Sequence, residues 1–221
     1  MNKIPKRLEA ISSLIPINAN VLDVGCDHAL LDIYLYQNKI SNNIVASDIN
    51  QNALNNAIEN IKKNHLENMI ETRLGNGLDV LKAEDNIDTV VISGMGSHTI
   101  IGILKNNLKK LKNINNLIIQ SNTDLKFLRK EITKLHYKIL DELIIEEDEK
   151  KYIIIKFVKG YKKYTERELY FGPVLLEKNE KLFQKYNEEE LDKLNLLLKL
   201  IPKDHFKEGY KIMKKIKLYK K

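Results

Sequence analysis

The chain has 221 residues, of which 43% are hydrophobic and 30% charged, a composition typical of a globular protein that buries a core. No apolar run approaches the roughly 20 residues that span a bilayer, and the basic amino terminus lacks the apolar stretch of a signal peptide. A single cysteine excludes an internal disulfide framework. We therefore expect a cytoplasmic protein that does not associate with membranes.

The charge of the chain is unevenly distributed. Residues 161–221 contain 16 Lys and Arg against 10 Asp and Glu, whereas the first 160 residues contain 21 against 20. Nearly all of the positive excess lies after Ile201, where lysines crowd one end of the chain. The two parts of the chain are therefore expected to have different electrostatic roles.

Short apolar runs alternate with helical periodicity in the first 160 residues, after an amphipathic segment at 7–14. The runs are rich in Val and Ile without strict alternation, as buried parallel strands are, and they lie at 21–25, 43–48, 69–74, 89–93 and 116–121. Helical spacing occurs between or after them, at 50–64, 100–111 and 125–135, the last with Thr123 or Asp124 as its cap. The alternation predicts an α/β fold with a doubly wound, Rossmann-like sheet.

The end of this sheet is predicted to be antiparallel. Strand-like runs at 137–145 and 152–158 are separated only by residues 146–151, a gap that holds no helix, so they should form a hairpin. A dinucleotide dehydrogenase would continue with a helical crossover and another parallel strand. A parallel sheet that ends in a hairpin is typical of class I methyltransferases, by analogy at the level of the fold.

Strand signals stop beyond Gly160. Gly172-Pro173 predicts the start of a helix whose apolar positions recur as far as Leu198, and Pro202 then breaks the run. A second amphipathic helix, about 204–219, completes an αα-hairpin. We expect a sheet domain at 1–160 and a helical domain at 161–221, which either packs on the sheet as scaffold or binds a partner through its lysines.

The turn that follows the first strand, Asp23-Val24-Gly25-Cys26-Asp27-His28, is the first candidate binding site. Gly25 permits a tight turn, and the helix that begins after it offers free backbone amides. The dinucleotide fingerprint Gly-x-Gly-x-x-Gly is absent. The carboxylate of Asp27 would repel a pyrophosphate but attract a cationic sulfonium or ammonium group. The alternative is that Asp27 only caps the following helix.

Three more strand ends carry polar residues or glycines. Asp48, followed by Ile49, suits the two hydroxyls of an adenosine ribose, although it could also only cap the next helix. Asn76, before Gly77, could bond an adenine edge, and Ser93-Gly94-Met95 leaves the fourth strand. Because ligands of open α/β sheets bind at the carboxyl ends of the strands, these residues together predict a site for S-adenosylmethionine.

Four segments follow one another along the chain: Gly25-Cys26-Asp27-His28-Ala29, Gly94-Met95-Gly96, Gln120-Ser121-Asn122 with Leu128-Arg129, and Phe171-Gly172-Pro173. Their order resembles the bacterial tRNA adenine-22 N1-methyltransferase family, over essentially the whole chain. The resemblance implies a class I methyltransferase domain followed by a helical coiled-coil domain that helps to bind tRNA. The chain departs from the family at Ser97, where a second glycine is frequent, and at Ser121, where proline is frequent.

On this resemblance Asp27 is the catalytic candidate, as acceptor of the adenine N6 proton or as stabiliser of positive charge on the ring. The cofactor-binding candidates are Arg7, Asp23, Gly25, Cys26, His28, Asp48, Ile49, Asn76, Gly77, Ser93, Gly94 and Met95. The substrate-binding candidates are Gly96, His98, Asn122, Lys207, Lys211, Lys214 and Lys215. Since Cys26, Asp27 and His28 are consecutive and cannot readily all chelate one ion, we expect no metal.

Other functions fit the same residues. The chain could methylate another RNA, a protein or a small molecule, or it could be a non-catalytic RNA-binding protein that keeps a nucleotide pocket. A dehydrogenase is disfavoured by Asp27 and by the terminal hairpin. The target base, its N1 atom and its position in tRNA follow from the resemblance alone. We expect a monomer.

Overall fold

The computed structural model describes residues 4–202 and 204–220, so Lys203 and Lys221 of the lysine-rich end lie outside the described residues. Five strands pair in parallel, as the apolar runs predict. They are β1 (Asn20–Val24), β2 (Asn43–Asp48), β3 (Ile70–Leu74), β4 (Thr89–Met95) and β5 (Asn116–Ser121). Helix α1 (Lys6–Ser13) precedes β1, and the helices between or after the strands are α2 (Leu30–Gln37), α3 (Gln51–Lys63), α4 (Ser97–Asn106) and α5 (Leu125–Thr133).

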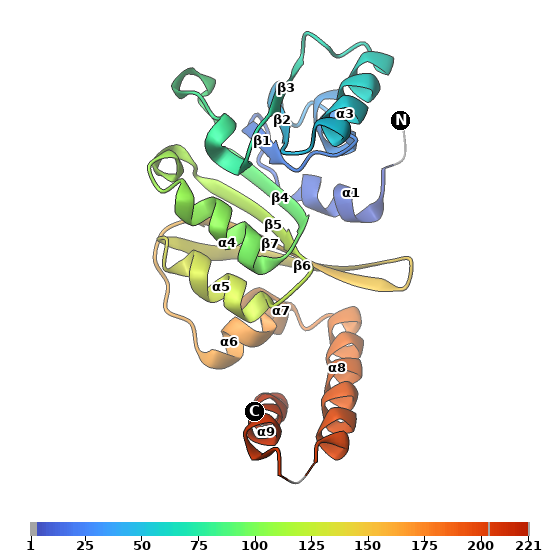
Figure 1. Ribbon diagram of the computed structural model, residues 1–221, viewed down its shortest axis with the longest axis vertical. Coiled ribbons are helices and arrows are strands. Elements are labelled where there is room, and N and C mark those ends of the chain that lie inside the picture. Colours follow the sequence, from blue (N-terminus) through green and yellow to red (C-terminus); the bar gives the residue numbers. More distant parts are fainter. Residues whose placement is uncertain (1–3, 203, 221) are drawn as a thin grey trace.

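Neighbouring residues of the central strands alternate between two hydrophobic cores. Val90 and Ile92 of β4 join a core with α4 and α5, while Val91 joins a core with α1, α2 and α3. Figure 1 is viewed from the side that α4 and α5 cover. Because both faces of the strands are buried, their sequences are continuously apolar instead of alternating, which is the signal that predicted them.

Short 3-10 helices occur at η1 (Gly77–Val80), η2 (Ala83–Asp85) and η3 (Lys110–Asn113). The helix expected at 100–111 is displaced in the structure: α4 begins at Ser97 and ends at Asn106, residues 107–109 form a turn, and η3 follows. Of the two cap candidates for α5, Thr123 and Asp124, the structure shows Asp124 as the cap. Its Oδ1 accepts the backbone N–H of Phe127 at 2.9 Å.

The sheet ends in the predicted antiparallel hairpin. β6 (Tyr137–Glu147) and β7 (Lys150–Lys159) are joined by Asp148 and Glu149, both with positive φ, as a primed two-residue turn requires. The strand order is β3-β2-β1-β4-β5-β7-β6, with β7 antiparallel to both of its neighbours. The fold is therefore the Rossmann-like sheet of class I methyltransferases.

The remaining chain is helical, with α6 (Glu166–Phe171), α7 (Pro173–Lys178), α8 (Lys181–Leu200) and α9 (Phe206–Tyr219). The prediction of one helix from Pro173 to Leu198 is wrong, because Asn179 adopts a left-handed conformation that separates α7 from α8. The predicted αα-hairpin is present as α8 and α9, which project from the sheet domain (Figure 1). Phe171, Leu175 and Phe183 belong to the core shared with α4 and α5, so the packed sheet domain continues beyond residue 160.

Candidate functional site

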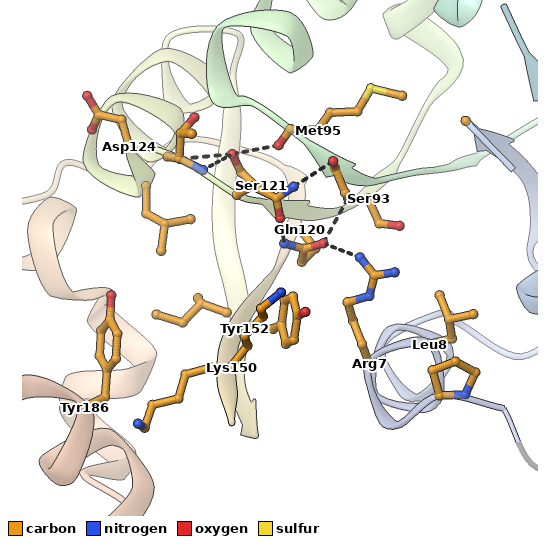
Figure 2. A pocket seen from close by; sticks show the side chains of 18 of the residues that line it. Arg7, Leu8, Ser93, Met95, Gln120, Ser121, Asp124, Lys150, Tyr152 and Tyr186 are labelled. Atoms are coloured by element: carbon orange, nitrogen blue, oxygen red, sulfur yellow. Dashed lines mark hydrogen bonds between the residues drawn. The ribbon is translucent and has the colours of Figure 1, made fainter. Parts of the chain in front are cut away.

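A cleft of about 1460 Å³ opens at the carboxyl ends of the parallel strands. From β1 the chain proceeds outward to β2 and β3, and from β4 it proceeds outward to β5 in the opposite direction. The loops after β1 and β4 therefore diverge and leave a crevice, which is where open α/β sheets bind ligands. The cleft continues from this crevice to the β6–β7 hairpin and to side chains of α8 and α9, part of which Figure 2 shows.

The turn after β1 is fastened to the end of β2. The backbone N–H groups of Gly25 and Cys26 donate to the carbonyl oxygen of Ser47 at 2.8 and 3.0 Å. Gly25 has a φ of +80°, and a Cβ at this position would lie 2.6 Å from Cε of Met95. The backbone conformation therefore favours glycine here, and any side chain would also displace the end of Met95.

Asp27 stands in a left-handed conformation with φ of +47°, and Ala29 follows with φ of +52°, a strained arrangement of the kind that occurs at functional sites. Its side chain is 66% exposed, lines the cleft, and has Oδ2 3.7 Å from Nε2 of His28. The N-cap of α2 is Ala29, with no side-chain hydrogen bond. The alternative that Asp27 only caps this helix is therefore wrong.

Asp48 lies beside this turn at the end of β2. Its Oδ2 accepts the backbone N–H of Asp27 at 3.4 Å and its Oδ1 accepts that of Asn50 at 2.8 Å. The cap of α3 is Asn50, whose side chain accepts the N–H groups of Asn52 and Ala53. Asp48 is thus not merely a helix cap, and it places a carboxylate in the cleft beside Asp27.

The loop after β4 is connected to the end of β5 through Gln120. The register between these strands shifts between Ile92 and Met95, and Gly94 takes a φ of +77° in this bulge. Gln120 Oε1 accepts both Gly94 N–H at 2.9 Å and Nη1 of Arg7 at 3.2 Å, while its Nε2 donates to Oδ1 of Asn122 at 2.9 Å (Figure 2). Gln120 therefore links three of the predicted site residues.

Two further carboxyl groups, those of Asp23 and Asp32, are buried next to the turn that follows β1. Asp32 of α2 is fully buried, and no N–H or O–H group of the described chain donates to either of its carboxylate oxygens. Its polar neighbour is the carboxyl group of Asp23, which lines the cleft. Burial raises the pKa of Asp23 to about 7, with a contribution from the charge of Asp48, and burial raises the pKa of Asp32 as well. Two buried carboxyls side by side can hydrogen-bond only if one is protonated, so burial and the charge of the neighbouring acid favour one shared proton on the pair.

Most of the predicted site residues meet in this cleft. Its lining includes Arg7, Asp23, Gly25, Cys26, Asp27, His28, Asp48, Ser93, Gly94, Met95, Asn122 and Lys215. Cys26 is a small buried residue, and burial beside Asp32 raises the pKa of its thiol, which keeps it protonated.

The other candidates lie outside the cleft wall: Ile49, Asn76, Gly77, Gly96, His98, Lys207, Lys211 and Lys214. Gly77 is buried where a Cβ would lie 2.6 Å from Cγ2 of Ile103, so packing against α4 accounts for it. His98 is exposed and stacks on Phe127, with ring centroids 4.3 Å apart. Asn76 is exposed on the loop whose Gly75 N–H donates to the carbonyl oxygen of Asp48.

The part of the cleft away from the cofactor turn was not anticipated. It is lined by aromatic side chains, Tyr152 of β7, Tyr170 of α6, Tyr186 of α8 and Tyr219 of α9. The guanidinium carbon of Arg7 lies 5.4 Å from the ring centroid of Tyr152, and burial raises the pKa of Tyr186 to about 12. No local pattern distinguishes these tyrosines from core residues, because they meet only when the hairpin and the helices pack.

Among the described residues, no helix is both long and apolar enough to span a bilayer. Among residues 4–202 and 204–220, no three His, Cys, Asp or Glu side chains gather as a metal ion would require.

The sheet order, the terminal hairpin and a switch-point cleft lined by carboxylates define an S-adenosylmethionine-dependent methyltransferase of class I. A sequence model described as tRNA (adenine(22)-N(1))-methyltransferase matches residues 21–221. The chain belongs to this tRNA methyltransferase family.

Individual relatives agree with this assignment. The tRNA (adenine(22)-N(1))-methyltransferase of Bacillus subtilis is 34% identical over 153 residues, which are 69% of this chain and 64% of that protein. A Streptococcus pneumoniae structure in complex with S-adenosyl-L-methionine superposes with a TM-score of 0.92 at 31% identity, covering 99% of this chain and 98% of that one. The structure of M. capricolum TrmK with S-adenosyl-homocysteine has a TM-score of 0.86 at 35% identity, covering 98% and 96%.

Proposed function

We propose that the protein methylates N1 of adenine 22 in tRNA and that Asp27 is its catalytic residue. The match of residues 21–221 to the tRNA (adenine(22)-N(1))-methyltransferase family carries the target, and the observation that carries the catalytic role is the position of Asp27, which lines the cleft beside the proposed cofactor residues. Asp27 caps no helix, and its exposed carboxylate in the cleft is free to act on a bound ligand.

The cofactor half of the cleft suits S-adenosylmethionine. Asp48 offers acceptors for the ribose hydroxyls, and Asp23 offers a carboxyl for the ammonium group. Arg7 lies in the same cleft, where its guanidinium suits the cofactor carboxylate. S-adenosylmethionine supplies an electrophilic methyl group when bound.

Asp27 acts on the substrate adenine. N1 carries a free lone pair, so no base is needed before attack, but the methylated ring is cationic until N6 loses a proton. A carboxylate near N6 stabilises this charge and accepts the proton. The backbone hydrogen bond from Asp27 to Asp48 fixes the turn from which the carboxylate projects. Because N1 lies on the Watson–Crick edge, a paired adenine has to leave its helix to reach the cleft.

The helical domain contributes RNA binding through α9. Lys193 on α8 is paired with Glu190 at 2.7 Å, and Lys185 with Glu146 at 3.9 Å. No lysine of α9 has such a carboxylate partner within the described part of the chain. One of them, Lys215, lines the cleft. Unpaired lysines on one helix favour contact with phosphates, which makes RNA affinity depend strongly on salt.

The assignment is tested with unmodified tRNA transcript and S-adenosylmethionine, followed by mass spectrometry of nucleosides. Wild-type protein should form 1-methyladenosine at position 22. Asp27→Asn should lose about 10²–10⁴-fold in turnover while its affinity for the cofactor stays unchanged. Asp79→Asn, an exposed carboxylate outside the cleft, is the matched control.

Other results would assign other functions. A methyl group in another nucleoside would identify a different RNA target, and tRNA binding without methyl transfer would identify a non-catalytic RNA-binding protein. Wild-type turnover by Asp27→Asn would remove the catalytic role of this residue. We further propose that the enzyme is a cytoplasmic monomer that needs no metal, which sedimentation and activity in the presence of chelators test.

A further inference from the structure

The outward face of α9 carries a stripe of exposed apolar side chains. Phe206 is 78% exposed, Tyr210 57% and Met213 51%. Their spacing of four and three residues places them on one side of the helix. We call these three residues, two aromatic rings and the thioether side chain of Met213, the aromatic stripe of α9.

The aromatic stripe is not the face that packs on α8. The half-buried positions of α9 include Gly209, Ile212 and Ile216, which lie on a different side of the helix. At Gly209 a Cβ would be 4.0 Å from Cδ1 of Leu198 on α8. Packing within the described chain therefore leaves the aromatic stripe uncovered.

Lysines border the aromatic stripe on the helix surface. Lys207, Lys214 and Lys217 lie next to it by helical position, and Nζ of Lys214 is 4.8 Å from the ring centroid of Tyr210. A second copy of this face would bring like charges together. Planar apolar rings in a positively charged surrounding instead suit a polyanion with exposed planar bases, which is unpaired RNA.

α9 also leads from the cleft to the aromatic stripe. Lys215 and Tyr219 line the cleft, and Phe206 is at the opposite end of the helix, about 20 Å away at 1.5 Å per residue. In Figure 1, α9 lies beside α8 below the sheet domain. Because Lys215 and Tyr219 lie on the opposite side of α9 from the aromatic stripe by helical position, an RNA whose target base enters the cleft has to pass around the helix to place a second segment over the stripe.

We propose that Phe206 and Tyr210 stack on unpaired bases of the tRNA at a site separate from the methylated adenine. This inference rests on the proposed binding of tRNA by α9, and it adds recognition of unpaired loop nucleotides to phosphate contacts. Stacking depends on bases that are free of a double helix, whereas lysine–phosphate contacts do not.

The experiment compares two double variants of the full chain. Affinity for tRNA transcript is measured between 50 and 200 mM KCl for Phe206→Ala/Tyr210→Ala and for Lys207→Ala/Lys211→Ala. The aromatic variant should bind about tenfold or more weakly at every salt concentration with an unchanged salt slope. The lysine variant should reduce the slope by about 1 to 2. With a blunt-ended RNA duplex, the aromatic variant should bind as wild type does.

These readouts separate the two proposals. Wild-type tRNA affinity in the aromatic variant, or an equal loss with the duplex, would overturn stacking. A wild-type dimer in sedimentation that the aromatic variant abolishes would also overturn it, because the stripe would then be covered by a second copy. An unchanged slope in the lysine variant would instead count against α9 as a phosphate-binding helix. Since all four side chains are exposed, cofactor affinity should be unaltered in both variants and reports correct folding.

Discussion

Arg129 of α5 and Glu142 of β6 form a completely buried ion pair, with Nε 2.8 Å from Oε1. The guanidinium also donates to the carbonyl oxygens of Leu169 and Tyr170 at the end of α6. Oε2 of Glu142 accepts the backbone N–H of Val174 at the start of α7 at 3.0 Å. The pair thus fixes the corner between α6 and α7, from which the helical hairpin projects.

Glu142→Gln should lower the free energy of unfolding by about 3–5 kcal/mol, because it leaves the buried guanidinium without its counter-charge. Urea denaturation measures the change. Glu59→Gln is the control, since Glu59 pairs with Lys63 at 3.7 Å with both side chains 70% exposed, and its effect should be below about 0.5 kcal/mol. Equal effects of the two substitutions would contradict the structural role of the buried pair.

Gly172→Ala should be strongly destabilising at the same corner. Gly172 has φ of +98°, and a Cβ there would lie 2.5 Å from Oε2 of Glu142 and 2.8 Å from Nη2 of Arg129. A loss of at least about 2 kcal/mol is expected from backbone strain and the displaced ion pair. At Gly102 in α4, a Cβ would have no neighbouring atom within 4 Å. Gly102→Ala should therefore raise the free energy of unfolding by about 0.5–1 kcal/mol. Thermal unfolding should show a lower melting temperature for Gly172→Ala and a higher one for Gly102→Ala than for wild type.

Stability should fall as pH rises from about 4 to about 7 because of the Asp23–Asp32 pair. The folded-state pKa of Asp23 is raised to about 7, so this contribution is fully present below the unfolded value and is lost as pH passes the folded value. Asp32→Asn keeps a hydrogen-bond donor for Asp23 and removes one acid whose pKa burial raises, so it should flatten this decline. Urea denaturation at pH 5 and pH 8 measures the change in the free energy of unfolding between the two pH values. Asp192→Asn, at an exposed position, is the control. An unchanged pH profile in Asp32→Asn would exclude the shared proton.

Gln120→Leu should weaken cofactor binding about tenfold, because Arg7, Gly94 N–H and Asn122 each lose a partner in the cleft. Gln120→Glu keeps both interactions of Oε1 and loses the donor to Asn122, so its effect should be smaller. Calorimetry with S-adenosyl-homocysteine compares the three proteins. Full affinity in the leucine variant would show that the loops after β4 and β5 are held by other contacts.

The elements that sequence predicted correctly are those whose signal is local. Runs such as 116–121 are apolar throughout because both faces of the strand are buried, and the gap at 146–151 is too short for a helix. The cofactor turn was recognisable because ligands meet the carboxyl ends of parallel strands wherever the fold is of this type.

The features that were missed depend on long-range packing. Asp32 has the appearance of a polar residue in an amphipathic helix, and only its position beneath β1 buries it beside Asp23. Helix α6 had a local signal, since Thr165 and Glu168 form a capping box. The motifs that contain Arg129 and Gly172 lie far apart along the chain, and their spacing does not predict that both meet the buried ion pair with Glu142.

β7 lies between β5 and β6, which has a consequence for the chain as it leaves the ribosome. All five parallel strands are complete once Ser121 has emerged, but the outer edge of β5 has no partner until β7 ends at Lys159. At 5–20 residues per second, this apolar edge is open for about two to eight seconds. Until β7 pairs with β5 and β6, strand β6 with Glu142 has no neighbour in the sheet, so nascent chains are most exposed to mispairing with one another just before the hairpin closes.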